Sequence, residues 1–203
     1  MHYVLFTEEL SAEAALLELL PKLIDLNQHT FQILVHGGKN DLLKKLPSKL
    51  SAMASMVANG YRFIILVDRD KEDCIQLKEQ LEKIAQDAGL YTKSNPTEMG
   101  MFSVVNRIVI EELESWFMGD PSAVESAYPG IKRSVFEERR YRIPDAIKGG
   151  TCETLERILR RASYFRAGLA KIEAARNISK YMDPDVNRSQ SFQYFVEGIR
   201  SLA

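Results

Sequence analysis

The sequence predicts an α/β protein, in which helices flank a mostly parallel sheet and a helical region follows. In the first 119 residues, apolar segments of strand length alternate with amphipathic segments of about 12–18 residues. The segment 61–67 is apolar almost throughout, which is typical of a strand buried on both faces. After residue 120 no segment has the pattern of a strand. We therefore expect an α/β domain at 1–119 and a basic helical C-terminal region at 120–203 packed on it.

The predicted elements follow one another regularly. Strands are expected at 2–6, 31–35, 61–67 and, as one or two strands, 101–110. Helices with apolar residues at helical spacing are expected from Ser11, over 41–57 and over 72–88, where Gly89 provides a stop. Asp120-Pro121 is a typical helix start. Further helices are predicted over 151–163, 164–181 and 189–202.

Composition excludes several classes of protein. The content of 45% hydrophobic and 27% charged residues is that of an ordinary globular protein. No apolar run approaches the roughly 20 residues that a membrane helix needs, and residues 1–9 have no pattern of an export signal. Cys74 and Cys152 suggest neither a disulfide framework nor a zinc cluster, and we expect both to be inert. The sequence thus predicts a cytoplasmic protein without a membrane partner.

Charge is distributed unevenly along the chain. Residues 1–129 carry 12 Lys and Arg against 19 Asp and Glu, a net charge of −7. Residues 130–180 carry 13 against 6, a net charge of +7. An acidic part joined to a basic part is compatible with a metal-type site beside a phosphate-binding surface, and equally with a mixed-charge helical surface.

Acidic residues gather where the predicted parallel strands end, which is the edge of an open sheet where ligands bind. Glu8 and Glu9 follow the first strand, and Asp68 and Asp70 follow the third. On an extended segment, residues i and i+2 point the same way, so Asp68 and Asp70 are expected to converge on one ion. After the last strand come Glu112 and Glu114, which either complete this shell or occupy the first turn of a helix.

Carboxylates without Cys or His partners form a hard-oxygen site, which suits Mg²⁺ or Mn²⁺. Such an ion relieves the repulsion between the carboxylates and activates water for attack on a phosphoryl group. Glu8 is then the natural proton carrier. The turn with Gly38 and Lys39 is interpreted either as a phosphate cradle or simply as a strand-to-helix turn. For His36, local hydrogen bonding is favoured over catalysis.

Five motifs are distributed along the chain: HGGK with DLL at 36–43, LVDRDKEDC at 66–74, ELESWFMGD at 112–120, RIPD at 142–145 and NRSQSF at 187–192. In the order and spacing of these motifs, nearly the whole chain resembles the RloG-like, TOPRIM-like family DUF4276. Glutamate after the first strand and D-x-D after the third also look like the TOPRIM arrangement of topoisomerases, primases and OLD-type nucleases. The resemblance implies magnesium-dependent handling of nucleic-acid phosphodiesters, in a restriction or phage-defence setting with an AAA- or ABC-type ATPase partner.

Carried over by position, the TOPRIM glutamate falls on Glu8, and the two aspartates fall on Asp68 and Asp70. TOPRIM motifs usually have glycine after the glutamate, whereas this chain has Glu9, so either Glu8 or Glu9 faces the metal. Many OLD-type nucleases add a lysine. Lys39 is the nearest candidate by strand position, and Lys171 is a remote one.

The basic C-terminal region offers candidate contacts to a nucleic-acid backbone. They are Arg139, Arg140, Arg142, Arg157, Arg160, Arg161, Arg188 and Ser189. Residues 157, 160 and 161 are spaced to lie on one helix face. Ser189 is alternatively a helix cap, and the arginines are alternatively a solvated surface.

These observations lead to three hypotheses of different classes. The first is a Mg²⁺-dependent nuclease with Glu8 as general acid/base and Asp68 and Asp70 as metal ligands. The second is a non-catalytic subunit of a defence complex that binds nucleic acid or an ATPase. The third is a small-molecule phosphotransferase.

Overall fold

The computed structural model describes residues 1–202, and contacts between Cα atoms divide the chain into two compact units. The first unit comprises 1–9, 24–108 and the C-terminal residues from 195. The second comprises 10–23 and 109–194. These units differ from the expected division at residues 119/120. The helix that follows the first strand packs on a helix more than 150 residues later, so it belongs with the second half of the chain.

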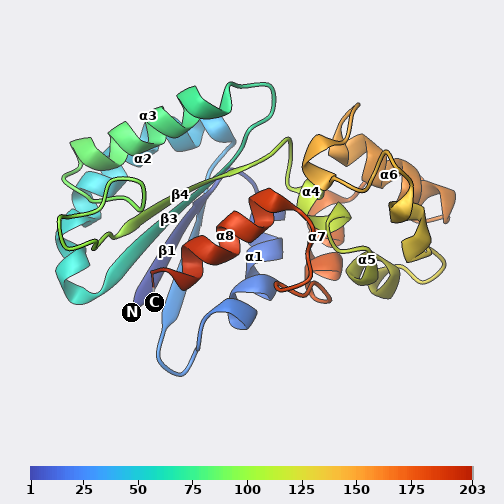
Figure 1. The fold of residues 1–203 in the computed structure, drawn as a ribbon, viewed down its shortest axis with the longest axis horizontal. Helices are drawn as coiled ribbons and strands as arrows, with labels where there is room; N and C mark the ends of the chain where they lie inside the picture. Colours follow the sequence, from blue (N-terminus) through green and yellow to red (C-terminus); the bar gives the residue numbers. More distant parts are fainter. Residues whose placement is uncertain (203) are drawn as a thin grey trace. The chain divides into compact units, whose positions relative to one another are not determined.

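One parallel sheet organises the first unit. Its strands are β1 (His2–Thr7), β2 (Thr30–Val35), β3 (Tyr61–Asp68) and β4 (Val104–Val109), in the order β2-β1-β3-β4 (Figure 1). β1 is paired in parallel with β2 on one side and with β3 on the other. The predicted α/β class and its parallel sheet are therefore confirmed, whereas the TOPRIM-like relationship stays a prediction.

Helices bury the sheet of the first unit. α2 (Lys39–Met53) and α3 (Cys74–Asp87) lie along one face (Figure 1), where Leu42, Leu46 and Leu50 of α2 join a core with Phe6 and Phe63. The C-terminal half of α8 (Gln190–Arg200) packs against β4: a Cβ atom on Gly198 would lie 2.8 Å from Val105 Cγ1. Residues 63–67 are almost completely buried, as the apolar run predicts.

The second unit is helical. Its elements are α1 (Leu10–Leu23), α4 (Glu114–Met118), α5 (Pro121–Ala127), the 3₁₀ turns η2 (Arg133–Glu137) and η3 (Pro144–Ala146), α6 (Thr151–Arg161) and α7 (Lys171–Ser179). The ammonium group of Lys22, at the end of α1, donates to three carbonyls at the end of α7, including Met182 O at 2.8 Å. No helix within residues 1–202 combines the length and apolarity needed to cross a bilayer.

Two predicted helices are shorter than expected. The helix expected over 41–57 ends at Met53 and continues as the 3₁₀ helix η1 (Ala54–Asn59). The helix expected over 164–181 begins only at Lys171. Ser163 and Phe165 have left-handed φ angles of 71° and 50°, so the backbone breaks there before α7 begins.

A tight polar junction links the end of α4 to the segment before α8 in the second unit. Asn187 Nδ2 donates to Trp116 O at 2.8 Å, and Asn187 Oδ1 accepts from Ser189 N at 2.9 Å. Asp120 caps α5 through Ala123 N at 3.0 Å, as predicted. Gly119 is required here, because a Cβ atom on this residue would lie 2.1 Å from Asn187 Oδ1.

We expect Gly119→Ala to lower the free energy of unfolding of the second unit by about 1–3 kcal/mol, because overpacking forces this junction apart. Urea unfolding measures this change in free energy. It is followed by the fluorescence of Trp116, the single tryptophan of the chain, which lies at the junction itself. Gly37→Ala is the matched control, since its Cβ atom would have no neighbour closer than 3.8 Å. Equal urea midpoints for the two variants would contradict the junction's role.

Candidate functional site

The strand order creates a switch point between β1 and β3. From β1 the chain crosses to β2 on one side, and β3 then pairs with the other side of β1. In open parallel sheets, ligands bind at the carboxyl ends of the strands where the order reverses in this way. Glu8 directly follows β1 and Asp68 ends β3, so both predicted residues flank this point.

Glu8 faces the end of β3. Its Oε1 atom accepts a hydrogen bond from Asp68 N at 2.8 Å, whereas Glu9 is exposed. Burial raises the pKa of Glu8 from 4.5 to about 7, although the amide of Asp68 and the charge of Lys39 oppose this rise. Of the two glutamates left open by the sequence, Glu8 is therefore the one turned toward this edge.

Lys39, the first residue of α2, reaches the loop after β3. Its Nζ atom lies 2.7 Å from Asp70 Oδ2, 3.0 Å from Glu72 Oε1 and 3.2 Å from Arg69 O. The side chain is only 8% exposed. Burial by itself lowers the pKa of Lys39, but the hydrogen bonds with Asp70 and Glu72 outweigh it and the pKa is raised. Sequence analysis missed Glu72 as a member of this group, although the acidic spacing at 68, 70 and 72 was a signal for it.

Asp68 and Asp70 do not lie on one extended segment, as their predicted convergence on one ion requires. β3 ends at Asp68, and Asp70 has a left-handed φ angle of 52°. Aspartate tolerates this conformation better than most residues because its short side chain hydrogen-bonds locally. The turn directs the Asp70 carboxylate to Lys39.

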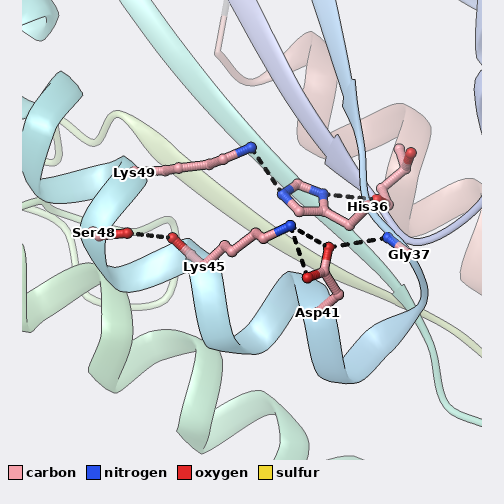
Figure 2. Close-up of polar contacts among 7 residues, drawn as sticks. His36, Gly37, Asp41, Lys45, Ser48 and Lys49 are labelled. Carbon is pink, nitrogen blue, oxygen red and sulfur yellow. Dashed lines mark hydrogen bonds and ion pairs between the residues drawn. The ribbon is translucent and has the colours of Figure 1, made fainter.

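The turn between β2 and α2 is satisfied within the chain (Figure 2). Gly37 N donates to Asp41 Oδ2 at 3.1 Å. Gly38 N donates to Glu8 O at 3.0 Å. Lys45 lies 2.8 Å from Asp41 and, with Gly37 N, lowers the pKa of that carboxyl. The structure thus favours a strand-to-helix turn over a phosphate cradle at Gly38 and Lys39. Gly38 has a φ angle of 93°, which explains glycine at this position.

His36 has a structural role, as expected. Lys49 Nζ lies 3.1 Å from Nε2, and Thr7 O lies 3.0 Å from Nδ1 (Figure 2). Because the ammonium group only donates, Nε2 accepts and the proton resides on Nδ1. Burial lowers the pKa of His36, and the charge of Lys49 acts in the same direction. The ring is therefore neutral and ties β2 to β1 and α2.

The remaining predicted metal ligands, Glu112 and Glu114, belong to the second unit. Glu112 Oε2 accepts from Cys152 N at 3.0 Å and from Thr151 Oγ1 at 3.3 Å, so it caps the first turn of α6. Glu114 is buried, which raises its pKa, and its carboxylate lies 3.8 Å from Lys171 Nζ. Their membership of a metal shell stays a prediction.

The thiol of Cys152 lies in surroundings that make it unreactive. Both cysteines are free, and burial raises the pKa of Cys152 to about 12, with the charge of Glu114 contributing. A thiol with such a pKa is protonated at neutral pH and is a poor nucleophile. Asp73 likewise has a structural role, because it caps α3 through Ile75 N and Gln76 N, both at 2.9 Å.

Of the arginines predicted to contact nucleic acid, some are engaged, which means that a partner within the second unit binds their guanidinium group, and others are open. Engaged groups are Arg140 with Glu138 at 2.7 Å, Arg142 with Glu137 O at 2.8 Å, Arg188 with Glu137 at 3.0 Å, Arg160 with Glu156, and Arg157 with Thr154 Oγ1 at 3.2 Å. Within residues 1–202, Arg139 and Arg161 have no such partner and are exposed. Residues 157, 160 and 161 line one cavity of about 430 Å³, which confirms that they share a helix face.

Ser189 is a helix cap. Its hydroxyl accepts from Phe192 N at 3.2 Å and donates to Asp145 Oδ1 at 2.8 Å, and the residue is fully buried. A hydroxyl held in this way has no exposed surface for a phosphate. The structure therefore supports the capping interpretation and removes Ser189 from the candidate contacts to nucleic acid.

The donor chemistry of the Glu8 edge fits a hard divalent cation, because carboxylate oxygens are the ligands such ions prefer. Within residues 1–202, however, no group of three or more His, Cys, Asp or Glu side chains is placed to hold a metal ion. The ammonium group of Lys39 compensates two of the nearby carboxylates instead. A single ion shared by Glu8, Asp68 and Asp70 stays a prediction.

The fold and this edge define the class: an α/β protein with carboxylates and a buried lysine at the switch point of a parallel sheet. The chain belongs to the family DUF4276, a domain of unknown function, whose model matches residues 7–200. Membership of DUF4276 is thus confirmed over nearly all of the chain, whereas the RloG-like, TOPRIM-like relationship stays a prediction. No curated protein and no solved structure matches it.

Glu8 makes the stability of the protein depend on pH. Because its pKa is raised, the folded chain binds a proton more tightly than the unfolded chain. This contribution to stability is complete below pH 4.5 and is lost as the pH rises to about 7.

Glu8→Gln keeps an acceptor for Asp68 N but does not titrate. We therefore expect its free energy of unfolding to exceed that of the wild type by about 1–3 kcal/mol at pH 8, allowing for solvent screening, and to equal it at pH 4.5. Urea titrations across this range measure the difference. The exposed neighbour variant Glu9→Gln is the control. A pH-independent difference would show that Glu8 titrates normally.

Proposed function

We propose that this protein hydrolyses phosphodiester bonds of nucleic acids at the carboxyl ends of β1 and β3, with Mg²⁺ or Mn²⁺ as cofactor. The observation that carries the proposal is Glu8, a carboxylic acid with a pKa of about 7 that flanks the switch point beside Asp68. A group that titrates near neutral pH both accepts and donates protons efficiently. The resemblance of this edge to the TOPRIM arrangement points in the same direction.

The residues that would hold the cation are Asp68 and Asp70, because the proposal needs both oxygens of Glu8 for its hydrogen bond and for proton transfer. When bound, the ion supplies positive charge to the phosphoryl oxygens and lowers the pKa of a coordinated water. Lys39 orients the Asp70 carboxylate through the 2.7 Å ion pair. Lys39 therefore acts as a positioning residue. By its position after the second strand, it is the nearest candidate for the lysine found in many OLD-type nucleases.

The proton transfer is assigned to the Glu8 carboxylate. Its Oε1 atom accepts from Asp68 N, so Oε2 is the oxygen that takes the proton from the attacking water. The water oxygen forms a bond to phosphorus as the ester P–O bond breaks, and the leaving oxygen receives the proton from Glu8. The polynucleotide is held by the basic residues of the second unit.

The cellular setting follows from the same proposal. Two free cysteines suit the reducing cytoplasm, and the family resemblance suggests phage defence with an ATPase partner.

A second candidate function, a non-catalytic subunit of such a complex, is supported by Lys39. Because its ammonium group neutralises Asp70 and Glu72, part of the edge is electrically balanced without any added cation.

We expect the full chain to cleave DNA or RNA with Mg²⁺ or Mn²⁺ and to be inactive with EDTA. Glu8→Gln should lower the rate by about 10²–10⁴-fold, the usual contribution of a proton-transfer group. The double variant Asp68→Asn/Asp70→Asn should abolish cleavage and weaken Mn²⁺ binding measured by electron paramagnetic resonance. A base role for Glu8 requires the wild-type rate to rise as the pH passes through about 7.

The matched control is Asp87→Asn, which removes an exposed carboxylate paired with Lys83 on α3. Cleavage by the double variant at the control's rate would exclude the proposed site. An inert wild type that still binds nucleic acid or an ATPase would identify the second candidate. Turnover of a generic phosphomonoester without nucleic-acid binding would identify a small-molecule phosphotransferase.

A further inference from the structure

The second unit contains a cavity of about 270 Å³ between the loop 130–141 and the end of α6. Ile131, Val135 and Ile158 give it an apolar wall, and Lys132, Arg140 and Arg161 add cationic groups. We call this feature the basic cavity. Three cations face a single lining carboxylate, Glu138, so the cavity favours an anionic ligand that also has an apolar part.

The three cationic side chains of the basic cavity differ in whether they have a partner. Arg140 is paired with Glu138 at 2.7 Å, and its guanidinium lies 4.6 Å from the centre of the Tyr141 ring. Lys132 and Arg161 are exposed, and neither has an ion-pair or hydrogen-bond partner within residues 1–202. Two open positive charges therefore remain available, beside a guanidinium whose plane is supported by an aromatic ring.

The size of the cavity limits what enters it. Its volume lies just below the range of about 300–1,000 Å³ that is typical of small-ligand sites, so it suits one ring system with a phosphate. In a duplex the faces of the bases are stacked on one another, and only the backbone and the base edges in the grooves are exposed to a protein. Only an unpaired nucleotide offers a base face to an apolar wall and a phosphate to neighbouring cations.

We propose that the basic cavity binds one unpaired nucleotide of a single-stranded nucleic acid. The base lies against the wall of Ile131, Val135 and Ile158, and the phosphate is bound by Lys132 and Arg161. Arg161 also lines the adjacent cavity on α6, together with Arg157, Arg160 and two glutamates. The inference rests on the proposed function in that a polynucleotide is the substrate, and it specifies the form of that substrate.

The test measures binding by the full chain in EDTA, so that hydrolysis does not interfere. Fluorescence polarisation of labelled 15-nucleotide oligo(dT) and oligo(U) is compared with that of a blunt duplex of the same length. We expect the single strands to bind at least tenfold more tightly than the duplex. Unlabelled thymidine or uridine monophosphate, added as a competitor, distinguishes a free nucleotide from a nucleotide within a strand. Displacement of the labelled strand by a monophosphate supports the proposal, and so does displacement that only an unlabelled oligonucleotide achieves.

Two variants separate charge from shape. Lys132→Gln/Arg161→Gln should weaken binding of the single strand about tenfold or more, and should lower the slope of log K against log salt by about two. Ala162→Phe fills the cavity from the half-buried end of α6. It should weaken binding about 5- to 100-fold, the range of lost base stacking, with the salt slope unchanged.

The control Lys44→Gln/Lys83→Gln removes two exposed lysines from α2 and α3, and should change affinity less than twofold. Affinities of the cavity variants equal to that of the control would overturn the proposal. Equal binding of duplex and single strand, or displacement by polyglutamate as effective as by oligonucleotide, would overturn it as well. Tight, cavity-dependent binding by a wild type that never cleaves would instead refute only the catalytic proposal.

Discussion

The contact on which the carboxyl edge of the sheet depends is the ion pair of Lys39 with Asp70 and Glu72. A buried ammonium group is unfavourable unless carboxylates surround it, and clustered carboxylates repel one another unless a cation lies between them. Lys39 begins α2, and Leu42, Leu46 and Leu50 of that helix are in the core of the first unit. Packing of an apolar helix face thus determines where one positive charge lies at the edge.

This arrangement divides the acidic residues of the edge into two electrostatic states. Asp70 and Glu72 are compensated at 2.7 and 3.0 Å. Glu8 has the weaker support of one backbone amide and a more distant Lys39, so burial dominates and its pKa rises to about 7. The Glu8 carboxyl group is consequently able to exchange a proton at neutral pH. Acid–base catalysis needs a group whose pKa lies near the working pH.

Local signals predicted the local features of this chain well. Apolar runs predicted the strands, and Asp120 is the helix-start residue that its position indicated. The contacts that assemble the edge are not local. The left-handed turn at Asp70 and the reach of Lys39 over 31 positions depend on tertiary packing. The packing of α1 on α7 likewise leaves no pattern in the sequence of either helix. The boundaries of the two units therefore could not be predicted from composition along the chain.

Charge separation along the chain connects the two proposals. A polynucleotide carries negative charge throughout, so the acidic edge around Glu8, Asp68 and Asp70 contributes little attraction by itself. Residues 130–180, with a net charge of +7, are the part of the chain able to provide that attraction. Two of their arginines, Arg140 and Arg160, are paired with glutamates, whereas Lys132, Arg139 and Arg161 have no such partner within residues 1–202. An apolar wall beside open cations adds affinity only for an exposed base, and so favours a single strand over a duplex.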